Sequence, residues 1–210
     1  NKDFAFIPNA IEVDKFLYDK DLRNKKRAEL GIKDEFVVGH VGRISYQKNH
    51  KLLIEIFNSL LKLERNALLI LVGVGEKEEE IKKQIHELGL DSKVKFLGNR
   101  SDVNELYQAM DVFVMPSFFE GVPVVGIEAQ FSDLPCIFSD RVPKEVKFNS
   151  KTQFVKLEAT LDEWVKSIER TKNIERNSKA KDLQNSQYDI KVAYSILENY
   201  YLDIVNKKGL

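Results

Sequence analysis

The sequence predicts an α/β fold with a mostly parallel sheet, helices on both faces and a helical C-terminal tail. Apolar, β-rich runs alternate with amphipathic segments, and each run has the length of a strand. Alternation of this kind is typical of parallel sheets covered on both faces, whose strands are apolar nearly throughout. The expected strands are FVVGHVG at 36–42, ALLILVG at 67–73, VKFLG at 94–98, DVFVMPS at 111–117 and PCIFSD at 135–140.

Helices are expected between these strands, at HKLLIEIFNSLLKL (50–63), EEIKKQIHELG (79–89), DVNELYQAM (102–110) and after Pro123. From about Leu161 onward the strand signal disappears, and LDEWVKSIERT and IKVAYSILENYYLDIV predict further helices. We therefore expect one domain over residues 1–210, of which 161–210 form a helical tail. Three tyrosines of the tail follow a helical spacing and are expected to pack on the core: Tyr194, Tyr200 and Tyr201.

Composition argues against several classes of function. The 210 residues are 43% hydrophobic, enough for a full core, and 33 Lys and Arg balance 33 Asp and Glu. Because no net charge favours a polyanionic partner, we expect no nucleic acid. One cysteine, Cys136, and the scattered His40, His50 and His86 suggest neither a disulfide framework nor a metal site. We expect no metal, no cofactor and a reducing compartment, the cytoplasm.

The ends of the sequence and its apolar stretches bear on targeting. No apolar stretch is long enough to cross a bilayer. The first residues, NKDFAF, contain neither a methionine nor a signal-peptide pattern. We therefore expect a chain that begins in the middle of a longer protein.

The turn after the first strand is the first candidate site, because ligands of parallel sheets collect at the carboxyl ends of the strands. GHVGRISYQKNH (39–50) places Gly42, Arg43 and Lys48 before a helix that should begin near Asn49. Glycine lets a ligand approach the backbone, and an arginine with a lysine, both expected to be exposed, can hold a diphosphate. A solvated basic loop with a helix cap at Asn49 explains this turn, taken alone, about equally well.

The turn after the second strand looks structural. LVGVGEKEEE (71–80) contains Gly73 and Gly75, but Glu78 stands where a dinucleotide fingerprint has its third glycine. The neighbouring glutamates would repel a pyrophosphate while complementing the dipole of the next helix. This turn therefore argues against a nicotinamide dehydrogenase.

The turn after the third strand, FLGNRSDVNEL (96–106), is a weaker candidate. It places Asn99 and Arg100 where they could contact a base or a ribose, with Ser101 or Asp102 capping the next helix. Taken alone, the turn is better explained as a surface loop.

The segment FFEGVPVVGIEAQ (118–130) is the most specific candidate. Glu120 should lie in a loop and Glu128 on an early turn of a helix that Pro123 can start, both near the positive helix end. Carboxylates accept hydrogen bonds from sugar hydroxyls, and free backbone N–H groups near Gly121 can face an anion. With the cations of the first turn, the combination predicts a nucleotide-sugar site. Each glutamate alone is more often a loop charge or a helix-dipole partner.

Together these motifs resemble the carboxyl-terminal half of family 4 glycosyltransferases of the GT-B fold. The resemblance runs from about Ile7 to Val146 and rests on IPNAIEVDKF, VGRISYQKNH, LVGVG, DVFVMPSFFEGVPVVGIEA and LPCIFSD. Within that family, the motifs are most similar to those of bacterial capsular and exopolysaccharide glycosyltransferases. The resemblance implies a Rossmann-like domain, one half of a GT-B fold, with the amino-terminal acceptor domain absent from this chain.

The resemblance also implies an activity: retaining transfer, without a metal, from a nucleoside diphosphate sugar, here a UDP-sugar, to a glycan or lipid-linked acceptor. Arg43 and Lys48 would hold the diphosphate and stabilise the leaving group, Glu120 would contact the transferred sugar, and Glu128 would accept from the ribose. The acceptor, and the inner face of the membrane, would be reached through the absent domain. The implied donor-binding residues are Gly42, Arg43, Lys48, Asn99, Arg100, Glu120, Gly121, Val122, Pro123, Val124 and Glu128.

The sequence departs from the family pattern at two positions. Val122 stands where a larger Phe or Leu is common, and Asp133 replaces a frequent glycine. Two other functions stay open: a sugar-nucleotide epimerase of GT-B architecture, and a non-catalytic nucleotide-sugar-binding module. As part of a glycosyltransferase, the isolated domain is expected to bind the donor without turning it over.

Overall fold

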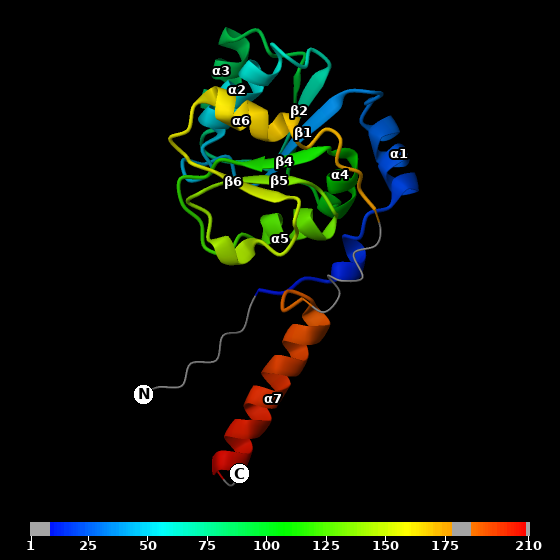
Figure 1. Cartoon of the computed structure of the whole chain (residues 1–210), viewed down its shortest axis with the longest axis vertical. Helices are drawn as coiled ribbons and strands as arrows, with labels where there is room; N and C mark the ends of the chain where they lie inside the picture. Colours follow the sequence, from blue (N-terminus) through cyan, green and yellow to red (C-terminus); the bar gives the residue numbers. More distant parts are fainter. Residues whose placement is uncertain (1–8, 178–185, 209–210) are drawn as a thin grey trace.

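A computed structural model, which describes residues 9–177 and 186–208, confirms the α/β fold (Figure 1). Six strands pair in parallel in the order β3-β2-β1-β4-β5-β6. The order changes direction between β1 and β4, and such a switch point is where open parallel sheets bind their ligands. The strands are β1 Phe36–Val41, β2 Ala67–Val72, β3 Val94–Gly98, β4 Val112–Met115, β5 Cys136–Ser139 and β6 Thr152–Val155.

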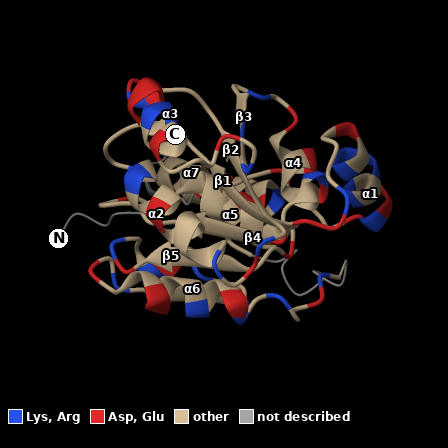
Figure 2. Ribbon diagram, turned by 90° about the horizontal axis from the view of Figure 1, so that it is seen from above, with Lys and Arg blue, Asp and Glu red and all other residues tan. Residues whose placement is uncertain are grey.

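Helices cover both faces of the sheet. One face packs against α4 (Val103–Ala109) and α5 (Val124–Phe131), and the other against α2 (His50–Leu60), α3 (Glu78–Glu87) and α6 (Leu161–Glu169). Figure 2 shows charged residues along the outer sides of α1, α3 and α6, whereas the central strands carry few. The other elements are α1 (Lys20–Glu29), α7 (Ile190–Lys208) and the 3-10 turns η1 (Val13–Lys15) and η2 (Lys144–Val146).

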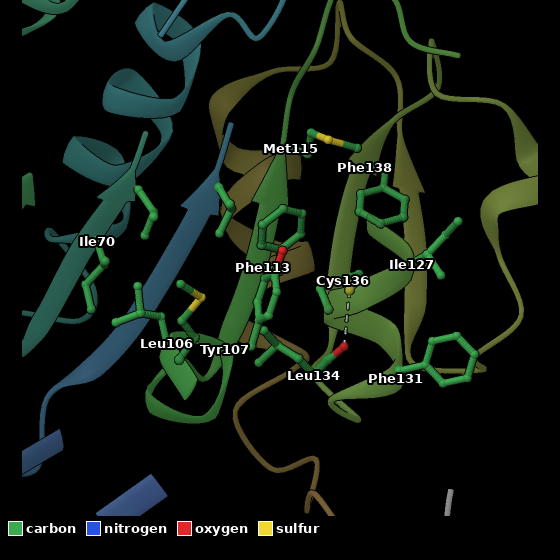
Figure 3. Close-up of a cluster of buried hydrophobic side chains, with 14 of the residues drawn as sticks. Ile70, Leu106, Tyr107, Phe113, Met115, Ile127, Phe131, Leu134, Cys136 and Phe138 are labelled. Carbon is green, nitrogen blue, oxygen red and sulfur yellow. Dashed lines mark hydrogen bonds between the residues drawn. The ribbon is translucent and has the colours of Figure 1, made fainter. Parts of the chain in front are cut away.

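Two hydrophobic layers hold the sheet between its helices. The layer beneath α4 and α5 contains Tyr107, Phe113 and Phe131, all fully buried (Figure 3). The opposite layer contains Phe57 of α2 and Trp164 of α6. Each large apolar side chain stabilises the fold by roughly 1.5–3 kcal/mol when buried. The rigid sheet edge that results carries the loops of the candidate site.

Helix boundaries near the candidate site agree with the sequence expectations. Asn49 caps α2 in the left-handed conformation, with φ of 53°, and its side chain accepts a hydrogen bond from Leu52 N. Its Nδ2 also donates to Pro116 O at 3.1 Å, which ties the loop after β4 to the start of α2. Helix α5 begins at Val124, directly after Pro123.

Two elements, α1 and β6, were not predicted from the sequence. The sequence of α1, KDLRNKKRAE, has almost no apolar face, and the helix instead packs against α4 through long charged side chains. Lys26 is buried and binds Glu29, Asp102 and Glu105 at 2.8–2.9 Å. Strand β6 is only four residues long and alternates weakly, so its pattern does not stand out from the polar residues around it.

Three arginines take up the carbonyl groups at the end of α4. Arg23 comes from α1, Arg27 lies one turn further along it, and Arg176 follows α6. Cations are stabilised at helix C-termini, where carbonyl groups lack partners inside the helix. The carbonyl groups that accept these bonds, at 2.8–3.1 Å, belong to Tyr107, Gln108, Ala109 and Met110.

Helix α7 extends away from the sheet (Figure 1), so the expectation that its tyrosines pack on the core is wrong. Tyr194 and Tyr201 are 63% and 60% exposed. The first turn is held by an ion pair from Lys191 to Asp14, but the sheet does not extend beneath the rest of the helix. Over the described ranges, no helix combines the length and the apolar character needed to cross a membrane.

The loops after β1 and β2 pack backbone against backbone, which explains why positions 73 and 75 are glycine. Gly42 N donates to Val72 O at 2.9 Å. A Cβ on Gly73 would lie 2.1 Å from Gly42 O, and one on Gly75 would lie 2.2 Å from Ile44 O. The glycine-containing turn is therefore structural, as predicted, because it supports the loop that carries Gly42.

Gly73→Ala should lower the free energy of unfolding by about 1–3 kcal/mol, because its methyl group meets a backbone carbonyl and its φ is strained. The glycine φ is 128°, outside the range that alanine adopts easily. Urea unfolding followed by circular dichroism measures the change. Gly121→Ala is the matched control, since its Cβ would meet nothing within 4 Å. Equal unfolding midpoints for the two variants would contradict the close backbone approach.

Candidate functional site

The loops after β1 and β4 join at the carboxyl edge of the sheet. Phe118 N donates to Gln47 O at 2.9 Å, and Gln47 Nε2 donates to Phe119 O and to Glu120 Oε2 at 3.0 and 3.1 Å. The loops are neighbours because β1 pairs directly with β4. Gln47 was not predicted from the sequence, because a neutral side chain in a polar loop gives no signal of its own.

Lys48 and Glu120 form the central ion pair of the site. Nζ of Lys48 lies 2.7 Å from Oε1 of Glu120, and the side chains are 14% and 6% exposed. The expectation that Lys48 is exposed is therefore wrong. A Cβ on Gly42 would lie 3.2 Å from Lys48 Cε and 3.3 Å from His40 Nε2, so this glycine makes room for the lysine stem.

Arg43 is arranged differently, because its side chain is 74% exposed. Its Nε donates to Glu76 Oε2 at 3.0 Å, and Glu76 is itself half exposed. Exposed ion pairs are worth no more than about 1 kcal/mol. Arg43 can therefore exchange Glu76 for another anion at small cost, as expected for an arginine on the turn.

Two buried histidines lie beneath the same loop. The rings of His40 and His50 pack edge to face with centroids 4.7 Å apart, and His40 Nδ1 lies 2.8 Å from Val114 O. Burial, helped by the charge of Lys48, lowers the pKa of His50 to about 4, and burial also keeps the pKa of His40 well below its ordinary value. Both rings are therefore neutral near pH 7. No group of three or more His, Cys, Asp or Glu in residues 9–177 and 186–208 could hold a metal ion.

Glu128 has a different environment from Glu120, although both belong to one segment. The hydroxyl group of Tyr107, on α4, is 2.9 Å from Glu128 Oε2. Burial raises the pKa of Glu128 above its ordinary value, and the hydrogen bond from Tyr107 opposes that rise. Glu120 thus pairs with Lys48 of the β1 loop, and Glu128 contacts a neutral phenol.

The start of α5 offers hydrogen-bond donors. In the described part of the chain, four amide N–H groups here donate to no protein acceptor, those of Gly121, Val122, Val124 and Val125. Such groups, at the positive end of a helix, suit an anion. Pro123 is buried and Val122 packs partly against the core, whereas Gly121 and Val124 are exposed.

Asn99 and Arg100 lie apart from this group, on the loop after β3. Asn99 is exposed. Arg100 donates from Nε and Nη2 to Asp102, both at 2.7 Å, and also pairs with Glu29. Asp102 is the residue before α4, but its carboxylate binds Arg100 and Lys26 instead of capping the helix. Among the described contacts, none joins Arg100 to the loops that carry Lys48 and Glu120.

Comparison with known proteins gives a family match. The family model for glycosyl transferases group 1 matches residues 22–190. EpsF of Bacillus subtilis (strain 168), provisionally named a glycosyltransferase, is 38% identical over 141 residues, which are 67% of this chain and 37% of EpsF. The capsular polysaccharide biosynthesis glycosyltransferase CapM of Staphylococcus aureus is 34% identical over 130 residues, 61% of this chain and 34% of CapM. The chain spans about a third of the length of these relatives.

A solved structure supports the same conclusion. HepE of Anabaena in complex with UDP-glucose matches with a TM-score of 0.76 and 25% identity, over 93% of this chain and 56% of HepE. The match confirms the expected Rossmann-like architecture. The relatives confirm the resemblance to glycosyltransferases that was inferred from the turn motifs.

Lys48→Met and Glu120→Gln should each lower the free energy of unfolding by about 3 kcal/mol or more, because each leaves a buried charge without its partner. The double variant should lose less than the sum of the two. Urea unfolding of the four proteins gives the coupling energy.

The exposed pair of Lys77 and Glu80 is the control, since its atoms are also 2.7 Å apart but its side chains are 43% and 58% exposed. Its coupling should stay within about 1 kcal/mol. A coupling between Lys48 and Glu120 no larger than that of the control would show that the central pair is not shielded from water.

Proposed function

Because the chain belongs to the glycosyl transferases group 1, we propose that it is the donor-binding domain of a retaining glycosyltransferase. The donor is a UDP-sugar, and the acceptor is a glycan or lipid-linked glycan of polysaccharide biosynthesis. The observation that carries the proposal is the meeting of Lys48, Glu120 and the N–H groups of α5 where β1 adjoins β4. The UDP-glucose bound to HepE and the capsular role of CapM support the choice of donor and pathway.

We assign the diphosphate to Arg43, Lys48 and the N–H groups at the start of α5. Arginine matches two phosphate oxygens with its planar fork, and lysine adds a point charge. The helix terminus adds donors that need no rearrangement. Lys48 already lies against Glu120, so a phosphate in this place would share the lysine with a carboxylate.

The two glutamates take the neutral parts of the donor. A carboxylate is a good acceptor for paired hydroxyl groups and a poor partner for phosphate. Glu120, beside Lys48, is assigned to the transferred sugar, and Glu128 to the ribose. The loop of Asn99 and Arg100 is assigned to the base, although Arg100 must then share its guanidinium with Asp102.

The chemistry follows from these positions. When the bond between the anomeric carbon and the diphosphate oxygen breaks, negative charge grows on the departing nucleotide. Arg43 and Lys48 stabilise that charge more strongly in the transition state than in the bound donor. Glu120 holds the sugar in the orientation that an acceptor oxygen can attack.

Arg43→Ala should raise the dissociation constant of UDP about 10- to 150-fold, the equivalent of about 1.5–3 kcal/mol for a lost charge-assisted contact. Isothermal titration at constant salt measures it. Arg141→Ala is the matched control: Arg141 follows β5 at the same sheet edge and pairs with Glu158. Failure of the wild-type chain to bind UDP, or equal affinities in all three proteins, would refute the donor assignment.

The isolated chain should bind UDP-glucose but not transfer its sugar. Transfer needs a bound acceptor and the exclusion of water, which we assign to the rest of a protein that extends beyond this chain. Parallel assays of this chain and the full-length protein, with labelled donor and a polysaccharide precursor, test the division of labour. Robust transfer by the isolated chain would overturn the two-domain mechanism.

A further inference from the structure

Tyr107 stands out because its hydroxyl group is directed from the core to a residue of the candidate site. The side chain is fully buried, and its ring packs edge to face against Phe113 with centroids 5.9 Å apart (Figure 3). A second ring, that of Phe16, lies 6.2 Å away. Because the ring is held on several sides, the hydroxyl group has a fixed position.

That hydroxyl group has two acceptors. It lies 2.9 Å from Glu128 Oε2 and 3.1 Å from Val125 O, both on α5. A hydroxyl group has one proton to donate, so the two acceptors share it. The contact ties the Glu128 side chain to α4 and selects one of its rotamers.

The contact occupies one oxygen of the Glu128 carboxylate and leaves the other for a ligand. Among the described residues, no protein donor reaches Oε1. Each carboxylate oxygen has two lone pairs, so a carboxylate held in this way can still accept from two neighbouring hydroxyl groups. We propose that Tyr107 is a positioning residue that orients Glu128 to accept the 2′ and 3′ hydroxyl groups of the donor ribose.

The proposal rests on the donor role of Glu128 proposed above. It adds that the preference for ribose over deoxyribose depends on a phenol in the core. The electrostatics agree with this role: burial favours the neutral acid, and the hydrogen bond from Tyr107 favours the carboxylate. Cys136 faces the phenol from β5, but burial raises the pKa of its thiol, so it stays neutral.

Tyr107→Phe removes the hydroxyl group and keeps the ring. We expect it to weaken binding of UDP about 10-fold and binding of 2′-deoxy-UDP only about threefold, because the deoxy ligand keeps one of the two hydroxyl groups from which Glu128 accepts. Glu128→Gln should show the same selectivity loss, and adding Tyr107→Phe to it should change little. A merely structural role would weaken both nucleotides alike and would add to the effect of Glu128→Gln.

Tyr188→Phe is the matched control. Tyr188 is also buried, and its hydroxyl group donates to Glu145 O at 2.8 Å. This variant should keep the ratio of UDP to deoxy-UDP affinity. If Tyr107→Phe also keeps that ratio in a chain that binds UDP, the proposal is overturned while the donor assignment stands.

A second readout needs no nucleotide. The carboxyl carbon of Glu128, followed by NMR as the pH changes, should titrate at a higher pH in Tyr107→Phe than in wild type or Tyr188→Phe, because the carboxylate loses its donor. An unchanged titration would refute the link between Tyr107 and Glu128. If the wild-type chain fails to bind UDP, the nucleotide proposal fails, and this titration still decides whether Tyr107 governs Glu128.

Discussion

The pairing of β1 with β4 is the constraint on which both the sheet and the candidate site depend. At its amino end, Val37 N donates to Asp111 Oδ2 and Asp111 N to Val37 O, at 2.7 and 2.8 Å. At its carboxyl end, Lys48 and the loop of Glu120 meet. Side chains alternate along a strand, so a slip of one residue would turn the apolar side chains to the wrong faces. The same slip would remove Asp111 from Val37 and separate the two loops.

Each cation that we assign to the donor pairs with a carboxylate of the protein. Lys48 pairs with Glu120, Arg43 with Glu76 and Arg100 with Asp102. An anionic ligand therefore competes with carboxylates for these cations, and the competition is weakest at the most exposed pair, that of Arg43. Exchange of partners at Arg43 would precede any change at the buried pair.

The starts of two helices could be predicted from local backbone preferences, whereas side-chain positions that depend on distant residues could not. The start of α2 followed from Asn49, which tolerates the left-handed conformation, and the start of α5 from Pro123. Asp133, at a frequent glycine position, has φ of 51°, and its carboxylate binds Lys151 and Asn177 N. The burial of Lys48 depends on a partner 72 positions away, and the role of Tyr107 depends on a helix packed across from it, so neither has a local signal.

The arginines at the end of α4 determine how much of the chain a shortened domain must include to keep the hydrogen bonds there. Arg23 precedes the first strand and Arg176 follows the last, yet both donate to Met110 O. The segment before the first strand and the segment after the last strand therefore both bind the C-terminal end of α4. A domain trimmed to its six strands and their connecting helices would lose donors from both sides at once. A sheet transplanted without these two flanks would leave carbonyl groups at the end of α4 without their arginine donors.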